Sequence, residues 1–181
     1  CWGVFATNRH SRAGATFDRN AKSISRTPEI RKLYGIDAAT GPPNALITAM
    51  LKAEIDLLWF GGIGTYIKSS SQSHLDAGDR ANDAIRINGE DVRCKVIGEG
   101  ANLGCTQLGR IEYAANGGAM NTDSIDNSAG VDSSDHEVNI KILVDSVMLE
   151  GSLNQKQRNA LLASMTDEVG KLVLVHNYRQ T

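Results

Sequence analysis

The sequence has few cysteines, no excess of either charge and no long hydrophobic run, and each absence excludes a class of protein. Its 19 Lys and Arg residues nearly balance its 21 Asp and Glu residues, which gives no electrostatic basis for binding nucleic acid or an anionic membrane. No apolar run approaches the roughly 20 residues of a membrane-spanning helix, so we expect no membrane partner. Cys1, Cys94 and Cys105 form no CxxC pair and cannot all be bridged, so we expect reduced thiols and a cytoplasmic protein.

The chain also lacks an initiator methionine and a signal-peptide core. It opens with CWGVFATNRH, and we therefore expect it to be a piece of a longer protein. A nucleophile–base pair is missing too, because nothing in the local sequence ties any of the four histidines to a serine or cysteine. We accordingly do not favour a hydrolase or phosphotransferase.

What is present is an alternation of helix and strand patterns, followed by helices alone. Thr27 as N-cap, Pro28 in the first turn and Gly35 after the last turn predict a short helix. The complete set of predicted helices covers 28–34, 41–54, 74–87, 106–118, 132–149 and 154–178, and strands are predicted at 55–60, 91–98 and within 119–130. This order predicts an α/β fold, with a parallel sheet and a C-terminal helical extension. The apolar strand at 55–60 is expected to be buried on both faces.

Glycines follow two of the predicted strands. Gly98, Gly100 and Gly104 lie between a strand and a helix, where a tight turn and a relaxed dinucleotide-binding motif are both possible. Asn102 favours the second interpretation, because its carboxamide can pair with another amide such as that of nicotinamide. Gly61-Gly62 forms the other exit, and two such exits from neighbouring strands would line one crevice.

The segment NSAGVDSSDHEV contains a third candidate site at the start of a long helix. Ser134 and Glu137 have the spacing of a capping box, while the alternative is that Ser134 and free backbone amides bind an anionic substrate group. A metal site from Asp132, Asp135 and His136 is disfavoured because further ligands are not evident nearby, so we assign no metal ligand. In the predicted helix 74–87, the i,i+4 pairs Asp76/Arg80 and Asp79/Asp83 favour a solvated face, with contact to a neighbouring subunit as the alternative.

Taken in order, several segments resemble the large NAD-specific glutamate dehydrogenases of bacteria. They are DLLWFGGIGTYIK, GDRANDAIR, VIGEGANLGCTQLGRIEYA, NTDSIDNSAGVDSSDHEVNIKIL and QKQRNALLASMTDEV, which cover most of the chain from about Ala21 onward. A more general amino-acid dehydrogenase pattern is visible beneath them, in EGAN at 99–102 and in the spacing of Asn127, Gly130, Val131, Ser134 and Glu137.

The resemblance implies oxidative deamination of L-glutamate to 2-oxoglutarate and ammonium, with NAD as the cofactor. It implies a partial Rossmann-like sheet with helices on both faces, divided into an irregular segment 1–26, part of an NAD-binding domain at 27–131, and helices 132–181 that return toward the substrate domain. The family's catalytic lysine and acid would lie upstream of this chain, and the full-length enzyme is expected to be a homo-oligomer. A non-catalytic nucleotide-binding or regulatory α/β module remains the alternative.

The same resemblance assigns roles to individual residues. Ser134 matches the position that helps to hold the distal carboxylate of the substrate. The cofactor contacts that it implies, with Asn102 near the nicotinamide, are Gly61, Gly62, Gly100, Ala101, Asn102 and Asn127.

Overall fold

Helix α1 (Pro28–Tyr34) shows how local residues set element boundaries in the computed structural model, which describes residues 15–181. The Thr27 hydroxyl accepts a hydrogen bond from the backbone N–H of Ile30 at 3.2 Å. At the other end, Gly35 adopts the left-handed conformation, with φ at 64°, where a side chain would be strained. The helix predicted between Thr27 and Gly35 is therefore confirmed, with both caps as expected.

A small apolar cluster forms around this helix. It contains Ile24 from strand β1 (Ile24–Ser25), Ile30 from α1 and Leu46 from helix α2 (Pro43–Leu51). Strand β1 pairs antiparallel with β2 (Thr40–Gly41), so a short strand occurs within the segment treated as irregular from the sequence. Residues 1–14 of that segment, including Cys1, lie outside the described residues.

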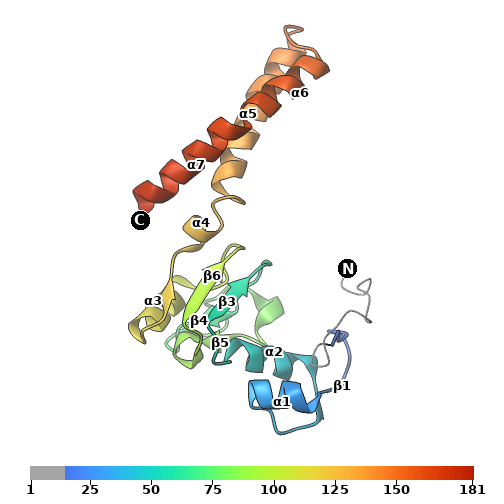
Figure 1. Cartoon of the computed structure of the whole chain (residues 1–181), viewed down its shortest axis with the longest axis vertical. Coiled ribbons are helices and arrows are strands. Elements are labelled where there is room, and N and C mark those ends of the chain that lie inside the picture. Colours follow the sequence, from blue (N-terminus) through green and yellow to red (C-terminus); the bar gives the residue numbers. More distant parts are fainter. Residues whose placement is uncertain (1–14) are drawn as a thin grey trace. The chain divides into compact units, whose positions relative to one another are not determined.

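The central sheet contains β3 (Leu57–Phe60), β6 (Val96–Glu99) and β7 (Ala119–Met120), in the order β3-β6-β7. Strands β3 and β6 lie side by side in Figure 1. Strands β6 and β7 are parallel, with Val96 opposite Ala119, and helix α3 (Gln107–Ala115) connects them. A second parallel pair joins β4 (Ile67–Lys68) to β5 (Ile87–Asn88), which is followed by the 3-10 helix η4 (Gly89–Asp91). The predicted α/β fold with a parallel sheet and C-terminal helices is confirmed.

Strand β3 is where predicted, but the expected burial of both its faces is wrong. Phe60 is buried, whereas Leu57 and Trp59 are 53% and 57% exposed. Alternate residues of a strand point to opposite faces, so Leu57 and Trp59 share one face, and that face is open in this chain. A run of apolar letters cannot by itself distinguish a strand covered on both sides from one covered on a single side.

The helix predicted at 74–87 is wrong. This segment consists of turns and a single 3-10 helix, η3 (Arg80–Asn82), and ends at the first residue of β5. The predicted Asp79/Asp83 repulsion does not arise, because the buried Arg86 guanidinium lies 2.6 Å from Asp83 and 3.9 Å from Asp79. Asp76 accepts hydrogen bonds from Ser73 in place of the expected ion pair with Arg80. The helix-like spacing of charges in this segment therefore arises around an arginine that points into the protein, and not on a solvated helix face.

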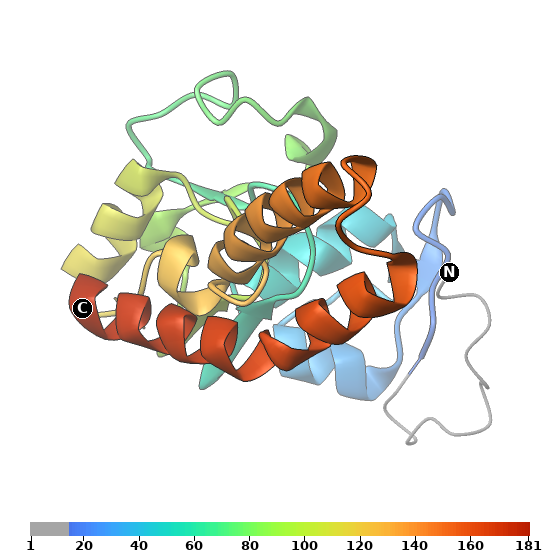
Figure 2. The same ribbon diagram turned by 90° about the horizontal axis from the view of Figure 1, so that it is seen from above.

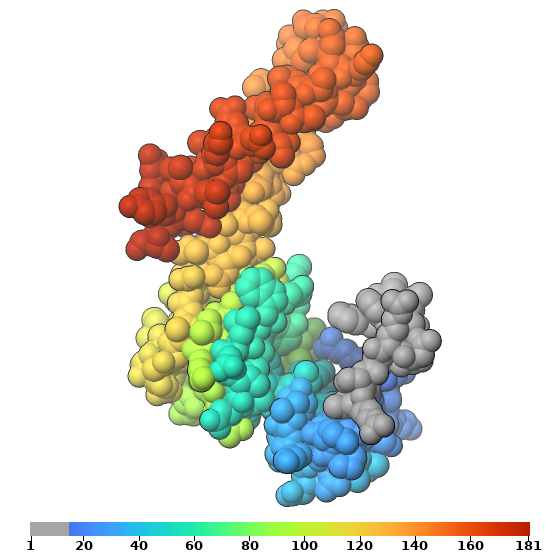
Figure 3. Space-filling model, viewed as in Figure 1, coloured from blue at the N-terminus to red at the C-terminus, as the bar shows by residue number. Residues whose placement is uncertain are grey.

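The last part of the chain is helical, from α4 (Asp123–Asp126) through α5 (Asp132–Leu149), α6 (Gln155–Ser164) and α7 (Thr166–Gln180). The predicted bounds of α5 are confirmed, while the single helix predicted after it is divided at Met165 into α6 and α7 (Figure 2). Asn154 and Gln157 form a capping box that starts α6. Helices α5 and α7 pack against each other (Figure 3). Val144 of α5 and Val173 of α7 are buried. Over the part of the chain described here, no helix has the length and apolar character to cross a membrane.

Contacts divide the chain into two compact units. The first contains residues 15–58, 64–97 and 103–120. The second, here called the helical unit, contains residues 59–63, 98–102 and 121–181. The glycine-rich exits of β3 and β6 both belong to the helical unit, together with α5 and α7, so every predicted site residue lies within it.

Candidate functional site

The two glycine-rich exits follow neighbouring strands. Gly61 and Gly62 come directly after β3, and the segment from Gly100 to Asn102 comes directly after β6. Because β3 and β6 are adjacent in a parallel sheet, both exits leave from the same edge, where α/β folds bind their ligands. The expected proximity of the two exits is therefore observed.

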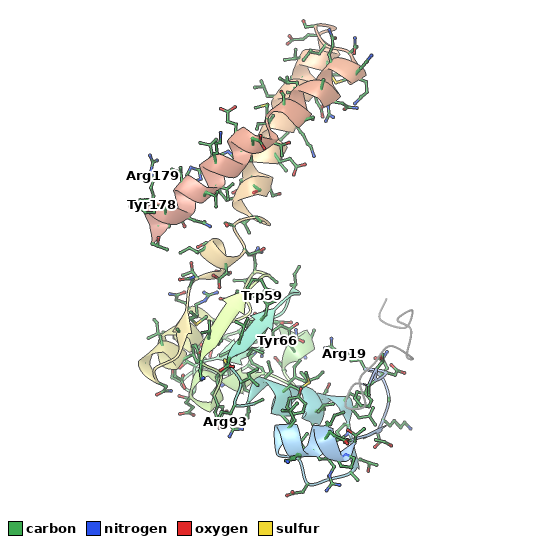
Figure 4. All side chains as sticks on the ribbon, in the orientation of Figure 1. Arg19, Trp59, Tyr66, Arg93, Tyr178 and Arg179 are labelled. Atoms are coloured by element: carbon green, nitrogen blue, oxygen red, sulfur yellow. The ribbon has the colours of Figure 1, made fainter. Side chains whose placement is uncertain are left out.

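The backbone of Gly98 and Gly100 is approached by an indole ring of the chain itself, that of Trp59. A Cβ atom at Gly98 would lie 2.4 Å from Cε3 of Trp59, and one at Gly100 would lie 2.5 Å from Cζ2. The Trp59 indole, which is labelled in Figure 4, therefore requires glycine at both positions. A bound dinucleotide is not needed to explain these two glycines, so they carry less weight as a cofactor motif than the sequence indicated.

Gly62 has open space where a side chain would be, whereas Gly98 and Gly100 are covered by the Trp59 ring. A Cβ atom at Gly62 would meet no heavy atom within 4 Å, and one at Gly61 would meet only the Trp59 ring, at 3.9 Å. Ala101 is buried, with 7% of its surface exposed. The backbone that a ligand could reach at this edge therefore lies on the β3 side.

Asn102 and Asn127 are 25 residues apart in the sequence, but their side chains are in contact. The Asn127 side-chain Nδ2 donates a hydrogen bond to Oδ1 of Asn102 at 2.9 Å. This contact uses the oxygen of the Asn102 carboxamide and not its N–H groups, which remain suited to donating to an amide oxygen. The two asparagines predicted as cofactor contacts thus form one polar pair.

Asp126 is a structural residue of this edge that the sequence did not reveal. Its Oδ2 accepts a hydrogen bond from the backbone N–H of Glu99 at 3.0 Å, and its Oδ1 accepts one from Nδ2 of Asn121 at 3.1 Å. These bonds tie the end of β6 to α4. No local spacing signals them, because the partners are 27 residues apart in the case of Glu99.

Ser134 lies in the first turn of α5, but not as a cap. The N-cap residue is Val131, without a side-chain cap hydrogen bond, so the capping box predicted for Ser134 and Glu137 is wrong. Glu137 instead pairs with Lys141. The competing interpretation, in which Ser134 contacts an anionic substrate group, stays a prediction.

The same turn contains part of a cluster of metal-ligating side chains. Asp132 and His136 lie close to His176 of α7, whereas Asp135 is exposed and does not belong to the cluster. The set of Asp132, Asp135 and His136 was disfavoured from the sequence for lack of further ligands, and the structure supplies one from a different helix, His176.

A separate hollow of about 380 Å³ lies among α5, α6 and α7 in the helical unit. Its lining mixes apolar residues with Glu137 and Lys141, and it includes Ser133 but none of the predicted cofactor residues. We therefore do not associate it with the cofactor edge.

Comparison with known proteins places these residues in context. The family described as bacterial NAD-glutamate dehydrogenase, catalytic domain, matches residues 1–181. Relatives from Halomonas elongata and Pseudomonas aeruginosa are each 56% identical over 180 residues, and one from Mycobacterium tuberculosis is 52% identical over 186 residues. All three are named NAD-specific glutamate dehydrogenase. Each match covers 99% of this chain but only 11% of the relative.

Proposed function

This chain belongs to the bacterial NAD-glutamate dehydrogenase catalytic-domain family, and from that membership we propose that it is part of an enzyme that oxidatively deaminates L-glutamate to 2-oxoglutarate and ammonium. The family resemblance expected from the sequence motifs is confirmed. The activity of the complete protein is inferred from its relatives, because the chain spans 11% of their length. On the same basis we propose a cytoplasmic homo-oligomer.

The observation that carries the proposal is the adjacency of the two strand exits at one edge of a parallel sheet. There, the open backbone at Gly62 and the Asn102–Asn127 pair belong to the same compact unit. This combination fits a nicotinamide cofactor, since a flat ring can lie against a bare backbone while a carboxamide pairs with the amide of the ring. We propose that this part of the fold is a portion of a Rossmann-like NAD-binding domain.

NAD, when bound, supplies the hydride acceptor, and this chain supplies positioning. Asn102 would orient the nicotinamide carboxamide, and Asn127 would hold the Asn102 side chain through the 2.9 Å hydrogen bond. Gly61 and Gly62 would form the adjoining wall, and Gly100 beneath the Trp59 indole and the buried Ala101 would support it from behind. Ser134, at the start of α5, would donate a hydrogen bond to the distal carboxylate of glutamate. We assign neither the catalytic base nor the acid to this chain, and we expect residues 1–181 alone to show no turnover.

The test is glutamate-dependent formation of NADH by the complete protein, followed by absorbance. Ser134→Ala should raise the KM for glutamate about tenfold or more, because a hydrogen bond to a charged group contributes roughly 1.5–3 kcal/mol. Ser146→Ala is a matched control on the same helix, since the Ser146 hydroxyl is bonded to the Ile142 carbonyl oxygen. An unchanged KM in Ser134→Ala would show that the substrate assignment is wrong.

Asn102→Ala tests the cofactor assignment separately. A lost neutral hydrogen bond should raise the KM for NAD about 2- to 13-fold, corresponding to about 0.5–1.5 kcal/mol. Asn139→Ala serves as the control, because its side chain bonds the Asp135 carbonyl oxygen on the exposed face of α5. If NAD saturation were unchanged in Asn102→Ala, the alternative of a non-catalytic module would gain support.

A further inference from the structure

Helices α5 and α7 bring three metal-ligating side chains together within the helical unit. Asp132 and His136 are four residues apart on α5 and therefore share one face of the helix. His176 reaches the same point from α7, across a separation of 44 residues, and its Nδ1 lies 2.8 Å from Oδ2 of Asp132. Nε2 of His136 lies 3.4 Å from Oδ1 of Asp132, and one ligand atom from each of the three residues falls within 4.8 Å of the others.

His136 provides a second observation at this point. Its Nε2 atom is buried and makes no hydrogen bond within the described structure, although it is directed toward a carboxylate. The imidazole rings of His136 and His176 stack, with centroids 5.4 Å apart and an angle of 25° between their planes. A buried polar atom without a partner is costly, so a ligand that bonds to Nε2 would remove that cost.

We propose that Asp132, His136 and His176 bind a divalent first-row transition cation, of which Zn²⁺ is the representative. Imidazole nitrogens and a carboxylate oxygen are ligands of this class, with metal–ligand distances of about 2.0–2.2 Å. At those distances, a tetrahedral site separates neighbouring ligand atoms by about 3.3 Å. The observed separations of 2.8 and 3.4 Å run to different oxygens of Asp132, and one ligand atom from each of the three residues lies within 4.8 Å of the others. Small side-chain rotations would thus complete a three-ligand site whose fourth position is open to water or another ligand.

The surrounding structure holds the three ligands on rigid elements. Asn177, adjacent to His176, donates a hydrogen bond from Nδ2 to Oγ of Ser128 at 2.8 Å. This bond fixes the end of α7 against the loop that leads into α5. A cation at the cluster would join the first turn of α5 to the last turns of α7, two residues from Ser134. Its effect is structural, because it would fix the position of the helix start.

The experiment measures zinc binding by the complete protein after treatment with a chelator. Wild-type protein is expected to take up one more equivalent of Zn²⁺ than Asp132→Asn or His176→Gln at the same free zinc concentration. Competition with a zinc indicator should show that each variant binds zinc about 100-fold more weakly than the wild type, or more weakly still. Even changes to residues that only support the metal ligands lower metal affinity about 10- to 100-fold. Asp135→Asn is the matched control, because it removes the same charge from the same turn outside the cluster and should bind zinc as the wild type does.

A second measurement covers the case in which a variant is poorly folded. Co²⁺ replaces Zn²⁺ in such sites and gives visible absorption when its coordination is tetrahedral, so wild type and Asp135→Asn should show a band that His136→Gln lacks. Equal zinc uptake by the wild type and both ligand variants would overturn the proposal. The absence of any Co²⁺ band in wild-type protein would overturn it as well, whether or not the variants fold.

Discussion

Arg86 organises the segment between β4 and β5 that a helix was predicted to occupy, and replacing it should open that segment. Its side chain is fully buried. Nε donates to the carbonyl oxygen of Thr65 at 2.7 Å, Nη1 donates to Oδ1 of Asp83 at 2.6 Å, and Nη2 donates to the carbonyl oxygen of Asp79. The substitution Arg86→Met keeps much of the side-chain volume but removes all of these donors.

The expected cost follows from the groups left behind. Breaking a buried ion pair by removing one partner costs about 3–5 kcal/mol. The two carboxylates retain some contact with solvent, with Asp79 23% and Asp83 39% exposed, so the lower end of that range applies. A cost of about 3 kcal/mol corresponds to an opening equilibrium roughly 100-fold more favourable.

Hydrogen–deuterium exchange of the complete protein measures this opening directly, in peptides that cover residues 64–88. Arg86→Met should accelerate exchange of their protected amides by about 100-fold when exchange is limited by the opening equilibrium. Lys95→Met is the control, because Lys95 and Asp56 form an ion pair at 2.7 Å in which both side chains are largely exposed. If the two variants exchanged equally at residues 64–88, the assignment of Arg86 as the anchor would be refuted.

Three further predictions concern Asp79, Gly100 and Cys94. The pKa of Asp79 is lowered by hydrogen bonds from the Asn82 side chain and the Thr65 backbone N–H. Its contribution to stability is therefore present above the ordinary Asp pKa of about 3.9 and is lost as pH falls through the lowered pKa. Protection factors at 64–88 should fall in that acidic range in the wild type, and should fall less in Asp79→Asn. Gly100→Val should displace the indole of Trp59 and raise the KM for NAD, whereas Gly62→Ala should leave the indole in place, and a crystal structure with an unmoved ring in Gly100→Val would contradict this. Burial raises the pKa of the Cys94 thiol, so native protein should react with iodoacetamide far more slowly at Cys94 than unfolded protein, and equal rates by mass spectrometry would count against it.

Sequence reasoning succeeded where a boundary depends on neighbouring residues. The caps of α1 are local, and the bounds of α5 follow from a continuous helical pattern that ends before a glycine. The adjacency of the β3 and β6 exits was expected for a different reason, since neighbouring parallel strands place their carboxyl ends at one edge of the sheet.

It failed where a residue is used by a distant part of the chain. Glycine at 98 and 100 is required by the ring of Trp59, which is about 40 residues away, so a motif based on spacing alone attributes these glycines to a ligand. The charges around Arg86 have helical spacing, but one buried guanidinium draws two of the carboxylates toward itself. A local pattern cannot distinguish a solvated charge from one that is directed inward.

The first turn of α5 shows how such a distant contact bears on function. Asp132 and Asp135 suit the positive end of the helix, but they oppose the binding of a substrate carboxylate at Ser134. Two histidines lie beside the Asp132 carboxylate, however. Nδ1 of His176 is 2.8 Å from Oδ2, and Nε2 of His136 is 3.4 Å from Oδ1. The cation proposed above, shared with Asp132, would offset that carboxylate and leave the backbone amides of the turn available to an anion. The substrate contact proposed for Ser134 would then depend on a residue 42 positions further along the chain, His176, which no motif around Ser134 includes.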